Sequence, residues 1–205
     1  MREMVPGLYH WKVYNPYIKD KVDSYFALLD PPILIDPMEP EEGLDQFRRF
    51  PPPAHIFLTN RLHDRHCQRY IDSFGTTVWC HRAGLHEFQD GSLAVTAFDH
   101  GDELPGGVKA IEVGVLCPEE TALLLPIAEG VLAIGDALVR WEGKIGFVPD
   151  FLLGDDPPAI RVGIRDRFLE ICSSYDFDHL LFAHGDPLIG EGKAALLGYL
   201  KSLKE

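Results

Sequence analysis

The residues best suited to chemistry lie together between His55 and His66, in the run His-Ile-Phe-Leu-Thr-Asn-Arg-Leu-His-Asp-Arg-His. The second half of this run contains imidazole, carboxylate, amide and guanidinium groups. Histidine and aspartate are common zinc ligands, and histidine also changes charge near neutral pH. Asparagine and arginine supply hydrogen-bond donors that can hold a ligand. The run therefore predicts a site for metal-assisted or acid–base chemistry.

Two secondary-structure elements flank these polar residues. The apolar run 55–59 predicts a strand. Cys67, Tyr70, Ile71 and Phe74 recur at i, i+3, i+4 and i+7, which predicts a helix with one buried face. The polar turn thus lies at the carboxyl end of a strand, where open α/β folds bind their ligands.

Polar residues also end three other predicted strands. Asp36 follows the strand 33–35, Asp136 follows Gly135 after an apolar segment, and His184 ends the strand 178–183. Each has a structural alternative: Asp136 is also suited to cap a turn, and His184 to close the turn after its strand. For His63 a core histidine bonded to the backbone remains an equal alternative.

The order of these segments resembles the metallo-β-lactamase superfamily. The usual turn of that family reads His-x-His-x-Asp-His. With Thr59 as the anchor, its four places fall on Asn60, Leu62, Asp64 and Arg65, so only the aspartate is retained. A histidine turn of the family is also replaced, since Leu116 stands at the corresponding place.

The resemblance implies a four-layer αββα sandwich of the α/β class, formed by a single domain of residues 1–205. The strands before the central turn form a meander, and the strands predicted at 108–116, 121–126 and 131–135 belong to a second sheet. Helices are expected at 41–50, from Asp155 to Tyr175, and at 193–203.

The resemblance also implies a metal centre, but the ligand set is incomplete. A dinuclear site needs about twice the three or four ligands of a single zinc. We therefore expect no pair of ions, and either no metal or one divalent ion, zinc first, on His63, Asp136 and His184. His66 or His86 is an alternative ligand. The candidate catalytic residues are Asp64, Asp136 and His184, and the candidate substrate-binding residues are Asn60, Arg65 and His86.

Arg65 stands where the family has a metal ligand. Its guanidinium carries a permanent charge and five donors. We expect it to pair with Asp136 or Asp64 and so to balance their charge without a metal. The alternative is a solvated arginine in the first turn of the helix; His66 and His86 are in the same way suited to exposed positions.

Composition narrows the function classes. The formal net charge of −13 argues against a nucleic-acid partner, which needs a basic surface. No apolar run reaches the roughly 20 residues of a membrane span, and Met1–Pro6 lacks the apolar core of a signal peptide. The four cysteines are scattered without a CxxC pair, which is typical of reduced core residues in the cytoplasm.

Two functions remain open at this stage. The first is a hydrolase-like protein that acts on a small ester or thioester with one metal or none. The second is a non-catalytic protein of the same fold that binds a small ligand or a partner protein. Substrate and oligomeric state are not defined by the sequence.

Overall fold

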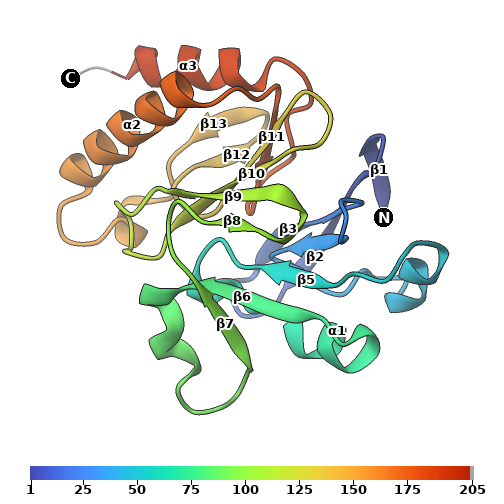
Figure 1. Cartoon of the computed structure of the whole chain (residues 1–205). Coiled ribbons are helices and arrows are strands. Elements are labelled where there is room, and N and C mark those ends of the chain that lie inside the picture. The colour runs from blue at the N-terminus through green and yellow to red at the C-terminus, as the bar shows by residue number, and fades with distance from the viewer. Residues whose placement is uncertain (204–205) are drawn as a thin grey trace.

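Two β-sheets stack face to face, with helices on their outer sides (Figure 1). The computed structural model describes residues 1–203, so the predicted domain 1–205 is described as far as Leu203. One sheet has seven strands in the order β1-β2-β3-β4-β5-β6-β7, and the other has five in the order β14-β11-β10-β9-β8. A separate hairpin pairs β12 with β13.

The first sheet changes from antiparallel to parallel at β4. Strands β1 to β4 pair as an antiparallel meander, whereas β4 to β7 are parallel. Its strands are β1 (Arg2–Val5), β2 (Leu8–Asn15), β3 (Asp20–Ala27), β4 (Ile33–Ile35), β5 (His55–Phe57), β6 (Thr77–His81) and β7 (Val95–Phe98). The turn that carries the polar residues follows β5, within the parallel half.

The second sheet is antiparallel apart from its last pair. Strand β14 lies parallel to β11, so the carboxyl ends of both strands reach the same edge. The strands of this sheet and of the hairpin are β8 (Glu103–Leu104), β9 (Val108–Glu112), β10 (Thr121–Leu125), β11 (Val131–Ile134), β12 (Val139–Trp141), β13 (Lys144–Gly146) and β14 (His179–Phe182).

The helices form the two outer layers. Helix α1 (Cys67–Phe74) lies by the first sheet, and α2 (Pro157–Ser174) and α3 (Gly192–Ser202) lie on the second (Figure 1). Asp156 caps α2 by accepting the amide of Ala159, as the predicted helix start required. Short 3₁₀ turns are η1 (Leu44–Arg49), η2 (Arg61–His63), η3 (Arg82–Phe88), η4 (Pro105–Gly107) and η5 (Asp150–Leu152).

Three hydrophobic clusters hold the four layers together. Tyr25 and Leu123 belong to the cluster between the two sheets. Phe47 and Tyr70 belong to the cluster between the first sheet and its helical layer. Phe168 belongs to the cluster between the second sheet and α2 and α3. Each sheet thus buries both faces, which confirms the predicted αββα sandwich.

Some local predictions were wrong. The helix expected at 41–50 is the 3₁₀ turn η1, because Gly43 has a φ of 82° and a helix cannot start before it. Strands β1, β7 and the β12–β13 hairpin were not predicted, since each is short and partly exposed. No helix within residues 1–203 combines the length and the apolar character that a membrane span requires.

Candidate functional site

The turn after β5 is shaped by Asn60. Its side-chain oxygen accepts the amide of Leu62 at 2.9 Å, which caps the 3₁₀ turn η2. The turn then directs alternate side chains to opposite sides. His63 points inward and its side chain is 5% exposed, whereas Leu62 is 59% exposed. The inward residue of the turn is therefore His63.

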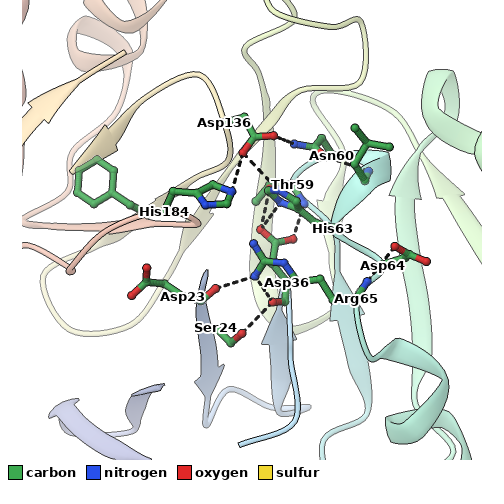
Figure 2. A network of polar contacts seen from close by, with 12 residues as sticks. Asp23, Ser24, Asp36, Thr59, Asn60, His63, Asp64, Arg65, Asp136 and His184 are labelled. Carbon is green, nitrogen blue, oxygen red and sulfur yellow. Dashed lines mark hydrogen bonds and ion pairs between the residues drawn. The ribbon is translucent and has the colours of Figure 1, made fainter. Parts of the chain in front are cut away.

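His63 meets Asp136 and His184 at the edge of the two sheets (Figure 2). Oδ1 of Asp136 lies 3.3 Å from Nε2 of His63 and 3.1 Å from Nε2 of His184. One potential ligand atom from each residue lies within 4.8 Å of the other two. The three residues follow β5, β11 and β14, so the strand ends bring them together as expected.

These three residues fit a single metal ion. Although Oδ1 of Asp136 is close to both imidazoles, neither contact has the geometry of a hydrogen bond, and this buried oxygen has no hydrogen-bond partner. Ligands of one zinc direct their lone pairs at the ion rather than at each other, with bonds of about 2.0–2.2 Å. Two imidazole nitrogens and one carboxylate oxygen are suitable donors. Within residues 1–203 this is the one such group of histidine, cysteine and acidic residues.

Asp36 fixes the orientation of His63. Its Oδ2 lies 3.0 Å from Nδ1 of His63 and accepts the Thr59 hydroxyl at 2.6 Å, and its Oδ1 accepts the Thr59 amide at 2.9 Å. A carboxylate on the far nitrogen of an imidazole is the usual partner of a metal-binding histidine. With Nδ1 directed at Asp36, Nε2 is directed at the candidate ion site.

In the absence of an ion, His63 is held between two negative charges. Burial alone would lower the pKa of His63, but the carboxylates of Asp136 and Asp36 outweigh it and raise the pKa to about 10. Burial would likewise raise the pKa of Asp36 and of Asp136, and the charge of His63 holds both below their usual range. The charge balance that we expected from Arg65 is therefore provided mainly by a protonated His63.

A second buried carboxylate supports the other side of Asp136. The Asn60 amide donates to Oδ2 of Asp136 at 2.9 Å and to Glu120 at 3.3 Å, and Glu120 also accepts the amide of Ala137 at 2.9 Å. A Cβ at Gly135 would lie 2.7 Å from Oε1 of Glu120, so only glycine fits before Asp136. Asn60 thus orients Asp136, and its predicted substrate-binding role stays a prediction.

Glu120 was not predicted as a site residue. It is fully buried, and burial together with the nearby charge of Asp136 raises its pKa to about 7. In the sequence it forms part of an acidic pair in a turn, where a solvated role is usual. The one available signal was that a strand that is apolar after Thr121 follows directly, because such a strand draws its neighbours into the core.

Arg65 is partly buried, but its predicted ion pair with Asp136 or Asp64 is wrong. Its Nη1 donates to the backbone carbonyls of Asp23 and Asp36, at 2.8 and 2.7 Å, and no side-chain carboxylate among the described residues lies within 4.0 Å of the guanidinium. Asp36 and Arg65 both have positive φ values, 44° and 39°. Such backbone strain costs on the order of 1–3 kcal/mol per residue and is frequent at functional sites.

Two other predicted site residues lie apart from the group. The Asp64 carboxylate accepts the amide of Arg65 at 2.9 Å and points away from Asp136 in Figure 2, because it follows the inward-turned His63. His86 is exposed on η3, with its Nδ1 2.8 Å from the carbonyl oxygen of Ala83. His66 accepts the Glu39 amide at 3.0 Å and so bonds to the segment after β4 instead.

The loop after β14 is held in place by a further buried acid. Asp23 accepts the amide of Gly185 at 2.7 Å and lies 2.7 Å from Nε2 of His10. Gly185 has a φ of 119°, and a Cβ there would lie 2.0 Å from the carbonyl oxygen of Arg140. The amide of Arg140 donates to the carbonyl of His184 at 3.0 Å. These contacts fix the position of His184.

Solved structures of the same architecture are known. A flavodiiron protein from Giardia intestinalis has a TM-score of 0.68 at 17% identity, and the match covers 98% of this chain and 58% of that protein. A β-lactamase domain protein from Burkholderia ambifaria has a TM-score of 0.66 at 16% identity over 98% of this chain and 75% of its own. A protein solved in a di-iron-bound form has a TM-score of 0.66 at 20% identity, covering 90% and 96%.

These likenesses confirm the predicted fold: the chain is a metallo-β-lactamase-fold protein. It spans little more than half the length of the flavodiiron protein. No protein-family model and no curated protein matches the chain.

Proposed function

We propose that this chain is a hydrolase-like protein that holds one divalent ion, zinc first, on His63, Asp136 and His184 and acts on a small ester or thioester. The observation that carries the proposal is the convergence of two imidazole nitrogens on one carboxylate oxygen without hydrogen-bond geometry. The neighbour solved in a di-iron-bound form supports a metal-binding role for this fold.

Each residue of the candidate site has a separate role in the proposed function. A bound divalent ion supplies a water of lowered pKa and a Lewis acid for a carbonyl oxygen. Asp36 fixes the tautomer and the ring orientation of His63. Asn60 holds Oδ2 of Asp136 and leaves Oδ1 directed at the imidazoles. The side chains of Asp136 and His184 are 26% and 16% exposed against 5% for His63, so a substrate approaches the group from the side of Asp136 and His184.

Metal analysis tests the first part of the proposal. Protein stripped with EDTA and dialysed against zinc should bind one equivalent, measured by inductively coupled plasma mass spectrometry. His184→Gln should weaken zinc binding by more than the roughly 10- to 100-fold that loss of a supporting partner costs. His86→Gln is the matched control, since His86 is an exposed histidine outside the group. Equal zinc affinity of wild type and His184→Gln would exclude this site.

Hydrolysis of 4-nitrophenyl acetate and of S-phenyl thioacetate tests the second part. The rate should rise when zinc is added to stripped wild-type protein and should not rise for His184→Gln. A rate that is independent of zinc, in protein that binds zinc, would refute the proposed catalysis and leave only the binding.

A second candidate is a non-catalytic protein that binds a small ligand or a partner protein. It is favoured by the pairing of His63 with two carboxylates, which balances their charge without an ion. For both functions we propose a small-molecule ligand and a cytoplasmic location. The charge of −13 disfavours nucleic acid, and free cysteines are typical of a reducing compartment.

A further inference from the structure

Arg65 uses only part of its guanidinium for structure. Nη1 is held between the carbonyl oxygens of Asp23, on β3, and of Asp36, directly after the neighbouring strand β4. Nη2 is buried and has no hydrogen-bond partner. A guanidinium is planar and rigid, so fixing Nη1 also fixes the direction of Nη2.

The position of Arg65 makes this donor part of the site. Figure 2 shows the side chain reaching from the turn toward the side on which Asp136 and His184 lie, opposite to the Asp64 carboxylate. The carboxylates of Asp36 and Asp136 are both close enough to influence the guanidinium electrostatically, yet neither makes a direct pair with it. A buried cation without a direct counterion is costly unless another group completes its contacts.

We propose that Nη2 of Arg65 is a donor for an anionic oxygen of the ligand, so that this site takes small molecules bearing a carboxylate or an oxyanion. The same donor would stabilise the oxyanion that develops on an ester carbonyl, as fixed donors do in acyl-transfer enzymes. The inference rests on the proposed function in taking this anion to be part of the substrate, but anion binding itself is measured separately.

The charge of Asp136 makes anion binding at Arg65 depend on whether a divalent ion is present. Its carboxylate repels an anion next to Arg65, and a divalent cation on His63, Asp136 and His184 would offset that repulsion. Anion binding at Arg65 should therefore be stronger when the ion is present. Sulfate is a suitable probe because it is a tetrahedral oxyanion and zinc sulfate is soluble.

Nuclear magnetic resonance of wild-type protein with ¹⁵N-labelled arginine gives the direct test. Sodium sulfate should shift the guanidinium resonances of Arg65 and slow the exchange of its Nη2 hydrogens with water. Sodium chloride at equal ionic strength should not. Because this measurement needs no substitution at Arg65 to observe binding, it does not depend on a variant that folds poorly.

Arg65→Lys provides the second test, since lysine retains the charge but lacks the second nitrogen. Its affinity for sulfate should be at least about tenfold weaker, measured by isothermal titration calorimetry with and without zinc. Arg69→Lys is the matched control, because Arg69 is an exposed arginine on α1. Circular dichroism checks that both variants are folded.

The outcomes separate this inference from the proposed function. Sulfate effects at Arg65 that are lost in Arg65→Lys support the inference, whether or not the protein hydrolyses esters. If zinc binds but sulfate leaves the Arg65 resonances unchanged, the inference is overturned while the proposed metal site stands. Equal sulfate affinity of wild type and Arg65→Lys also overturns it.

Discussion

Replacing His63 by glutamine should remove a specific pH dependence of stability in the metal-free protein. The carboxylates of Asp36 and Asp136 raise the pKa of His63 from 6.5 to about 10. The native state then holds a proton that the unfolded state releases, so this stabilisation is full below pH 6.5 and is lost as the pH rises through 10. At 1.36 kcal/mol per pKa unit, the difference between 6.5 and 10 corresponds to about 5 kcal/mol.

The loss of the imidazole has a second effect at neutral pH. His63→Gln leaves two buried carboxylates without their cation, and breaking a buried pair in this way costs roughly 3–5 kcal/mol. Arg65 does not replace His63, because its Nη1 is already held by backbone carbonyls. The variant should therefore be less stable at pH 7 and should lose less stability than wild type between pH 7 and 10, where its remaining slope comes from cysteines whose pKa burial raises.

Urea unfolding followed by tryptophan fluorescence, in EDTA and at pH values from 6.5 to 10, measures both effects. Wild type and His86→Gln should lose stability together over this range. The reasoning is refuted if the unfolding free energy of wild type is constant over the range, or if His63→Gln has the same slope as wild type. Either result would mean that His63 is neutral between its two carboxylates.

Further predictions concern two residues that support the candidate site, Glu120 and Gly185, and the net charge of the protein. Burial and Asp136 raise the pKa of Glu120 from 4.5 to about 7, so its protonated carboxyl stabilises the native state by about 3 kcal/mol below pH 4.5, and this contribution is lost as the pH rises through 7. In urea titrations the unfolding free energy of wild type relative to Glu120→Gln should fall by about this amount from pH 4.5 to 7, because His100, whose pKa is lowered to about 4, affects both proteins alike. Gly185→Ala would place a Cβ 2.0 Å from the carbonyl oxygen of Arg140, and thermal unfolding should show destabilisation of roughly 3 kcal/mol or more. With a net charge of −13, the protein should not shift duplex DNA or RNA in a gel at physiological salt and low-micromolar protein; a clear shift would contradict the assignment to small ligands.

The layers of the fold could be predicted from the sequence because the spacing of apolar residues indicates which faces of strands and helices are buried. The apolar run before Thr59 and the spacing of Cys67, Tyr70 and Phe74 predicted β5 and α1 closely. Asp136 and His184 were expected at strand ends for a related reason, and both follow buried parallel strands. Strand ends of this kind meet at one edge whatever the loops between them do.

The direction of individual side chains in the turn was not accessible in the same way. Alignment with the family favoured Asp64, but the 3₁₀ turn η2 turns His63 inward instead. The partners of Arg65 are two backbone carbonyl groups. Every residue has such a group, so the residue types in the sequence could not identify these partners. Glu120 accepts a hydrogen bond from Asn60, which is 60 positions away in the chain, and no local sequence pattern predicts such a distant partner.

The candidate ligands come from both halves of the chain. Strands β1 to β7, up to Phe98, build one sheet and carry His63, whereas β8 to β14, from Glu103 onward, build the other and carry Asp136 and His184. An ion bound by all three residues would link the two sheets, and it could bind only after the sheets have docked. Its occupancy and the closure of the sandwich are therefore linked by mass action. If the chain were divided within residues 99–102, zinc should promote the reassembly of the two fragments.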